Sequence, residues 1–193
     1  MIPDEPDPHS PRRATFRVSL RHGMYLLIEK LLRWCINPRF RARLLRLLGA
    51  KIGSNVRVYE VQLFNLEEGF RNLQLGDNVH VGPGCHLDLT GRLTIGARST
   101  LSPAVTILTH ADPGASHGSR IALFYPPRTA AVSIGNDCWL GASVTVLAGC
   151  TIHDCVVIGA GSVVTHDAPS GYLVAGVPAR TKSALTLGGN IKP

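Results

Sequence analysis

The sequence is poor in aromatic residues and contains no long uninterrupted apolar segment. Phe, Trp and Tyr make up 6% of its 193 residues, although 45% of the residues are hydrophobic. The most apolar run, residues 24–36, includes Glu29, Lys30 and Arg33, so it is too short and too charged to span a bilayer. These features predict a globular protein with a narrow core of aliphatic side chains.

Other common signatures are also missing. The five cysteines form no CxxC pair that would suggest zinc. The opening residues, MIPDEPDPHSPRR, lack the apolar stretch of a signal peptide. We therefore expect reduced cysteines and a cytoplasmic location.

The net charge of +7 is concentrated near the N-terminus. Residues 1–51 hold eleven Lys/Arg and four Asp/Glu, whereas residues 52–193 hold nine of each. A nucleic-acid-binding protein usually spreads such charge over a folded face together with aromatic residues. Confinement of the charge to one segment therefore argues against a nucleic-acid partner.

The sequence does contain a six-residue repeat between residues 132 and 178. An aliphatic residue recurs at every sixth position, and a small or medium residue follows four places later. A period of six fits neither a helix nor a flat sheet. It predicts a solenoid in which each short strand and turn bury their apolar face against neighbouring units. The aliphatic positions are Ile134, Leu140, Val146, Ile152, Ile158 and Val164.

The repeat ends in the segment IGAGSVVTHDAPSGYLVAGVPAR. Together they resemble the left-handed parallel β-helix acyltransferases of the hexapeptide-repeat superfamily. They are most similar to the sugar O-acetyltransferases, meaning the galactoside and maltose acetyltransferase group and its relatives in polysaccharide biosynthesis. The resemblance implies an all-β solenoid, a homotrimer, and acetyl-CoA as the acyl donor.

The repeat also divides the chain. We expect a disordered tail over residues 1–14, the left-handed β-helix domain over residues 50–185, and a C-terminal tail over residues 186–193. Residues 59–74 break the register and are predicted to bulge outward. The longest interruption, residues 108–131, is predicted to be a polar functional loop, because a solenoid tolerates insertions at its corners.

Residues 15–49 are predicted to form a basic amphipathic helical segment, interrupted at Pro38. One interpretation places residues 15–48 on an anionic membrane, at the inner face of the cell membrane. The other makes the segment a cap over the open end of the solenoid, and the two are compatible. The expected apolar stripe consists of Met24, Leu27, Ile28, Leu31, Leu32 and Cys35.

His110 lies at the root of the long interruption, directly after VTILT. Acetyl transfer to a hydroxyl needs a base, and imidazole, with a pKa of about 6.5, suits that role near neutral pH. In the family that the chain resembles, a histidine at this place is the general base. Asp88 and Asp112 are candidates to orient its ring or bind the acceptor, although both are also common turn formers.

The other histidines do not predict a metal site. His80 and His86 are one hexad apart and should lie on successive faces of the solenoid. His110 and His117 are seven residues apart within one loop. Neither pair has the histidine spacing of the zinc-dependent β-helix carbonic anhydrases, so we expect no metal.

The C-terminal coils are predicted to bind acetyl-CoA. Small residues there would let the pantetheine arm approach the backbone. The resemblance implies that Arg180 binds a CoA phosphate, for which a guanidinium is well suited. His166 stands where the family often has lysine, and a neutral imidazole would hold phosphate less firmly. The full set implied by the resemblance is Trp139, Ala142, Ala160, Thr165, His166 and Arg180.

Together these features predict an acetyl-CoA-dependent O-acetyltransferase for a sugar or glycan precursor. We expect direct transfer without a covalent enzyme intermediate, in clefts between adjacent solenoids. The alternatives are an N-acetyltransferase of an amino sugar or amino acid, a non-catalytic scaffold, and a metal enzyme, because the fold alone does not choose among them.

Overall fold

The computed structural model describes residues 16–115 and 118–186, with side chains from residue 20 onward. The tail predicted for residues 1–14, residues 187–193 of the predicted C-terminal tail, and His117 lie outside the described residues.

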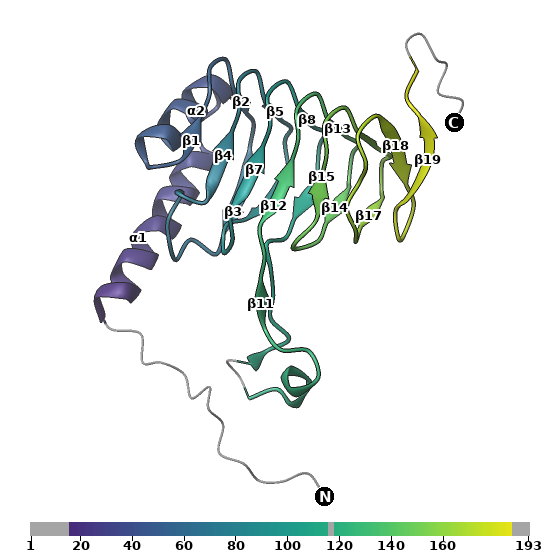
Figure 1. The fold of residues 1–193 in the computed structure, drawn as a ribbon. Coiled ribbons are helices and arrows are strands. Elements are labelled where there is room, and N and C mark those ends of the chain that lie inside the picture. The colour runs from purple at the N-terminus through teal and green to yellow at the C-terminus, as the bar shows by residue number, and fades with distance from the viewer. Residues whose placement is uncertain (1–15, 116–117, 187–193) are drawn as a thin grey trace, which may run out of the picture.

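The body of the protein is a parallel β-solenoid whose coils each add one short strand to three sheets, here called A, B and C (Figure 1). The predicted fold class is confirmed. Sheet A contains β1 (Lys51–Ile52), β4 (Leu73–Leu75), β7 (Leu93–Ile95), β12 (Val132–Ile134) and β15 (Thr151–Ile152). Sheet B contains β2 (Arg57–Val58), β5 (His80–Val81), β8 (Thr100–Leu101), β13 (Trp139–Leu140), β16 (Val157–Ile158), β18 (Tyr172–Ala175) and the antiparallel β19 (Arg180–Ala184). Sheet C contains β3 (Val61–Phe64), β6 (Cys85–Asp88), β9 (Thr106–Ile107), β14 (Thr145–Val146) and β17 (Val163–Val164).

The aliphatic residues of the hexads fill the interior of the solenoid. Ile134 lies in register between Ile95 and Ile152 of the neighbouring coils, and all three are at most 1% exposed. Each fully buried side chain of this size stabilises the fold by about 1.5–3 kcal/mol. At the corners, residues such as Asp137 adopt left-handed backbone (φ 56°), which Asn, Asp and Gly tolerate best.

Three cysteines occupy small interior positions of the repeat, as expected. Cys85, Cys138 and Cys150 are free and buried. Burial raises the pKa of the Cys85 thiol to about 11, so this group stays protonated near neutral pH.

Two helices lie at the N-terminal end of the solenoid, α1 (Phe16–Arg33) and α2 (Pro38–Leu47) (Figure 1). Pro38 is the first residue of α2, where its missing N–H costs nothing. Asn37 caps this helix by accepting hydrogen bonds from the backbone N–H groups of Arg39 and Phe40 (3.0 and 3.1 Å).

Two buried charged side chains fasten the helices to the first coil. Arg41 donates to the carbonyl oxygens of Leu32 and Val58, at 2.9 Å each. Glu29 of α1 accepts a hydrogen bond from the backbone N–H of Leu63 on β3 (3.2 Å). The helices therefore do cover the end of the solenoid.

The apolar stripe predicted for α1 is only partly buried. Leu32 is 7% exposed, but Met24, Leu27 and Leu31 are 51%, 59% and 60% exposed. The face of α1 that packs on the solenoid includes Glu29 instead, so half of the predicted stripe faces outward.

Residues 59–74 do not bulge outward as predicted. The stretch contains β3 and the start of β4, and residues 65–72 between these strands, here called the inner excursion, leave the coil. Leu66 and Phe70 within it are fully buried, and the Phe70 ring meets Tyr25 of α1 edge-on, with centroids 5.9 Å apart. The apolar residues of this stretch miss the six-residue period because they pack against a helix.

The long interruption leaves the solenoid between β9 and β12 (Figure 1). Strand β10 (His110–Ala111) pairs antiparallel with β11 (Arg128–Thr129), and a short 3₁₀ helix, η2 (Arg120–Leu123), lies beyond them. We call residues 110–129 the arm. Its far end is less polar than predicted, since Ile121, Leu123, Phe124 and Tyr125 are 48% to 74% exposed.

Candidate active site

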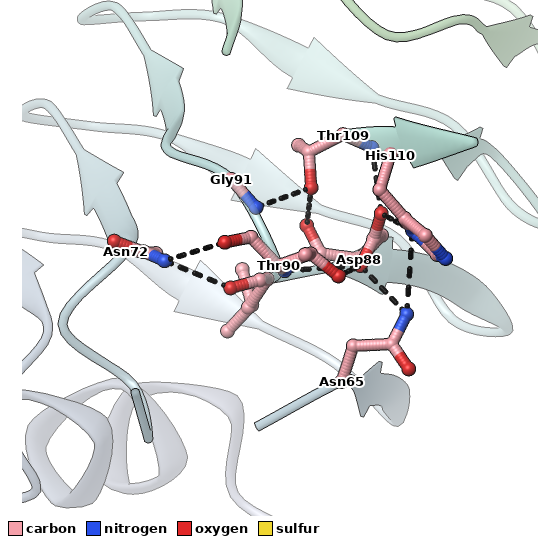
Figure 2. Close-up of polar contacts among 8 residues, drawn as sticks. Asn65, Asn72, Asp88, Thr90, Gly91, Thr109 and His110 are labelled. Carbon is pink, nitrogen blue, oxygen red and sulfur yellow. Dashed lines mark hydrogen bonds and ion pairs between the residues drawn. The ribbon is translucent and has the colours of Figure 1, made fainter. Parts of the chain in front are cut away.

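His110 lies at the root of the arm, where the chain leaves the solenoid after β9. Its side chain is 30% exposed, and its Nδ1 atom lies 2.6 Å from Oδ2 of Asp88, the last residue of β6 (Figure 2). The structure thus brings together two residues 22 positions apart that the sequence singled out. Stacking of successive coils is what makes them neighbours.

Asp88 is fully buried and accepts five hydrogen bonds. Its Oδ1 atom accepts from Asn65 Nδ2 (2.9 Å) and from the backbone N and Oγ1 of Thr90 (3.0 and 2.8 Å). Its Oδ2 atom accepts from the Thr109 backbone N (2.7 Å) and from His110 Nδ1. Burial alone would raise the pKa of Asp88, but these donors outweigh it and hold the pKa well below its usual range.

An ionised Asp88 fixes the tautomer of His110. A carboxylate can only accept hydrogen bonds, so Nδ1 of the imidazole carries the hydrogen and Nε2 carries the lone pair. Nε2 points away from Asp88 (Figure 2). Because five donors already saturate the Asp88 carboxylate, the geometry favours its role in orienting His110 over contact with an acceptor.

Asn65 is the site residue that the sequence did not reveal. It opens the inner excursion with a left-handed backbone (φ 56°), and its amide donates to Asp88. The same nitrogen lies 3.4 Å from His110 Nδ1, but that atom already donates to Asp88. The sequence offered one signal for it: Asn65 directly follows the apolar residues of a strand, and asparagine often adopts the left-handed conformation that turns a chain.

Side chains from two neighbouring segments hydrogen-bond to the backbone of the corner that follows Asp88. Thr109 is buried, and its hydroxyl accepts from Gly91 N (2.9 Å) and donates to the Asp88 carbonyl (3.1 Å). Asn72 of the inner excursion donates to the carbonyls of Leu89 and Thr90 (2.9 and 3.1 Å) (Figure 2). Asp88 therefore has a rigid support, as a residue that orients a base requires.

Asp112, the second candidate, occupies a different position. Its Oδ1 atom accepts from the backbone N–H groups of Gly114 and Ala115 (2.8 and 2.9 Å), which turns the chain early in the arm. Its side chain is exposed. The structure therefore pairs Asp88, and not Asp112, with Nδ1 of His110.

Four of the residues assigned to acetyl-CoA lie along sheet B and the corner that follows it. Ala142 and Ala160 are exposed on adjacent coils, and the Gly161 N–H donates to the Ala142 carbonyl (2.9 Å). Trp139 on β13 is 50% exposed and donates from Nε1 to Ser102 Oγ (3.0 Å). Arg180 begins β19 at the end of this sheet. Small exposed side chains on adjacent coils leave room for a narrow chain such as pantetheine.

Thr165 and His166 lie elsewhere. They follow β17, at the corner between sheets C and A, which is also the corner where Asn65, Asp88 and His110 stand on earlier coils. Thr165 Oγ1 lies 2.8 Å from His166 Nδ1. A single chain therefore presents the predicted site residues at two separate corners.

The described residues hold no cluster of three or more His, Cys, Asp or Glu side chains that could bind a metal ion. His80 lies on sheet B and His86 on sheet C, so the two occupy different faces as expected.

Known proteins share this pattern. The family of bacterial transferase hexapeptide proteins (six repeats) matches residues 131–166. WcaF of Escherichia coli K12, named as a colanic acid biosynthesis acetyltransferase, is 37% identical over 141 residues, covering 73% of this chain and 72% of WcaF. The chain belongs to the hexapeptide-repeat acetyltransferases.

Solved structures agree with this assignment. A maltose O-acetyltransferase from Clostridium difficile 630 superposes with a TM-score of 0.71 at 25% identity, over 89% of this chain and 90% of that one. A galactoside acetyltransferase in complex with coenzyme A has a TM-score of 0.55 at 25% identity, over 85% and 82% of the two chains. Relatives and structural neighbours are thus acetyltransferases, and the chain is an enzyme of this family, not the non-catalytic scaffold considered as an alternative.

Proposed function

We propose that this acetyltransferase moves the acetyl group of acetyl-CoA to a hydroxyl of a sugar or glycan precursor. The observation that carries the proposal is the His110–Asp88 pair, with Nε2 of the imidazole turned away from its partner. The names of the relatives, which refer to colanic acid, galactoside and maltose, support a carbohydrate acceptor.

In the proposed reaction, His110 Nε2 takes the proton of the acceptor hydroxyl as its oxygen attacks the thioester carbonyl carbon. The tetrahedral intermediate collapses, the carbon–sulfur bond breaks, and the leaving thiolate takes the proton back from Nε2. Asp88 stabilises the transient imidazolium through Nδ1 while staying ionised. The acetyl group passes directly to the acceptor, without a covalent enzyme intermediate.

We also propose that the enzyme is a homotrimer with its sites between copies. Ala142, Ala160 and Arg180 lie along one corner of a chain, whereas His110 lies at another. Cyclic packing would set the acetyl-CoA corner of one solenoid against the His110 corner of the next.

Mixed oligomers test this arrangement. His110→Ala removes the base, and Ala160→Trp blocks the acetyl-CoA corner, so each variant alone should be inactive. If the two residues act across an interface, a one-to-one mixture should regain about a quarter of the wild-type sites. A mixture that exchanges subunits and stays inactive would place both residues in one chain's site instead.

The acceptor is tested by mass spectrometry of sugars and glycans incubated with labelled acetyl-CoA. An ester product should disappear in mild alkali, whereas the amide of an N-acetyltransferase would survive. Stable products throughout the panel would favour the amino-sugar or amino-acid alternative.

The proposed location is the cytoplasm, with residues 15–48 touching the inner face of the cell membrane. Within the described residues, no helix is long and apolar enough to cross a bilayer. The contact would therefore be peripheral.

A further inference from the structure

The outer face of α1 carries an apolar ridge that stays largely exposed among the residues that the structure describes. Its residues are spaced four, three, four and three apart, which places them along one side of a helix. Trp34, just beyond the helix, is 85% exposed, more than any other member of the ridge. The ridge consists of Leu20, Met24, Leu27, Leu31 and Trp34, which are 51% to 85% exposed.

The ridge continues into a groove between the two helices. This groove is lined only by aliphatic side chains and has a volume of about 270 Å³. Leu47 at its edge is 82% exposed, and Phe40 on the same helix, α2, is 51% exposed. Exposed apolar areas of this extent usually mark an interaction surface. The groove is lined by Ile28, Leu31, Leu32, Leu44, Leu47 and Leu48.

The two helices that carry this apolar surface also carry exposed cationic side chains. Arg21, Lys30, Arg39 and Arg43 are all exposed. The one acidic residue between positions 20 and 51 is Glu29, which is buried and paired with Arg33 (3.0 Å).

One acidic side chain does approach the ridge from the solenoid. Glu60, which lies just before β3, lines a second groove together with Trp34, Lys30 and Arg33. Residues 20–50 hold seven Lys/Arg and one Asp/Glu, so this single carboxylate leaves the helical segment strongly positive. The surface therefore fits a partner that is apolar and negatively charged.

We infer that this face of α1 and α2 docks the enzyme on an anionic lipid surface. The ridge and the groove would enter the boundary between headgroups and acyl chains, with the arginines and lysine at the phosphates. Tryptophan at the edge of such a surface is typical of membrane interfaces. This inference deepens the membrane contact proposed above and does not depend on the acetyl-transfer reaction.

A second copy of the chain is a poorer fit to the same face. Two α1 helices paired along the ridge would bring their flanking cations together, with no exposed acidic residue on either helix to offset them. Nucleic acid is a poorer fit as well, because its phosphates would meet the apolar ridge.

The test uses full-length protein and two kinds of vesicle, one of phosphatidylcholine alone and one with phosphatidylglycerol added. Wild type should sediment with the anionic vesicles, and higher salt should release it. Trp34 and Trp139 are the only tryptophans. A blue shift of the emission on binding should therefore persist in Trp139→Phe and vanish in Trp34→Phe.

Leu27→Glu/Leu31→Glu should weaken binding to anionic vesicles at least about tenfold, because two carboxylates would have to enter the interface. Leu123→Glu/Phe124→Glu is the matched control, since both arm residues are apolar and even more exposed than Leu27 and Leu31. It should bind like wild type. Acetylation of a soluble acceptor by the ridge variant should stay normal, which separates this inference from the proposed reaction.

Equal vesicle binding by the ridge variant and the control would overturn the inference. So would a change in sedimentation coefficient of the ridge variant without lipid, because a second copy would then cover the face. If the ridge variant does not fold, Arg39→Glu/Arg43→Glu supplies the same test and should lose binding to anionic vesicles.

Discussion

The inner excursion and the arm interrupt the same solenoid, but the first folds inward and the second projects away. Leu66 and Phe70 of the inner excursion are fully buried beneath α1, whereas Phe124 at the end of the arm is 74% exposed. Both segments begin at the corner between sheets C and A. Asn65 opens one and His110 opens the other, on either side of Asp88.

This comparison shows how a regular solenoid can hold a reactive site. The inward segment contributes apolar surface and a fixed amide, so it supports the carboxylate. The outward segment contributes the imidazole, which remains 30% exposed. The site therefore forms where two irregular segments meet on successive coils, while the repeat between them supplies the rigid spacing.

The largest expected effect is on catalysis at the root of the arm. His110→Ala should lower turnover about 10²–10⁴-fold, because the proposed base is removed. The oligomeric state and the thermal unfolding midpoint should change little. His86→Ala, an exposed histidine on sheet C, is the control, and activity of His110→Ala near the wild-type level would disprove the assignment.

Replacing a phenylalanine by alanine should destabilise the protein strongly in the inner excursion and hardly at all in the arm. Phe70→Ala should lower the free energy of unfolding by about 3–5 kcal/mol, because it leaves a cavity under α1. Phe124→Ala should change it by less than about 0.5 kcal/mol. Urea unfolding of the two variants measures the difference, and equal costs would mean that the end of the arm is buried in solution.

Asp88→Asn should affect both activity and stability. The amide can donate to Nδ1 and stabilise the wrong imidazole tautomer, so turnover should fall about 10²–10⁴-fold. Stability at neutral pH should fall by about 2 kcal/mol, because the buried donors lose a charged acceptor.

The pH dependence of that loss has a defined sign. The pKa of Asp88 is lowered in the folded protein, so its contribution is present above the unfolded-state pKa of about 3.9 and declines as the pH falls below it. The difference between wild type and Asp88→Asn should thus shrink in acid. Asp77→Asn, at an exposed corner of sheet A, should leave turnover unchanged.

The smallest effect is expected at Asn65. Asn65→Gly keeps the left-handed backbone but removes the amide, so turnover should fall about tenfold, the equivalent of one hydrogen bond to a charged group. The pH–rate profile should shift, since Asp88 loses a donor. Asn55→Gly, at another left-handed asparagine (φ 50°), is the control for the backbone and should be neutral for turnover.

Much of this architecture could be predicted from the spacing of residues. The six-residue period gives the coils, and its interruption draws attention to His110 and to Asp88 nearby. Asn65 could not be found in the same way, because its contact depends on the stacking of coils 23 residues apart. The spacing also failed to show that Met24, Leu27 and Leu31 of the predicted stripe face outward, since spacing alone does not say which apolar residues of a helix meet the core.

The short pair of β10 with β11 has a further consequence for how substrate preference could change. His110 and Ala111 are paired with Thr129 and Arg128. The Ala130 N–H also donates to the Thr109 carbonyl (2.9 Å), where the arm joins the solenoid. The two ends of the arm are thus fixed side by side whatever lies between them. We therefore expect a change of length or sequence within positions 112–127 to leave the contact between His110 and Asp88 in place.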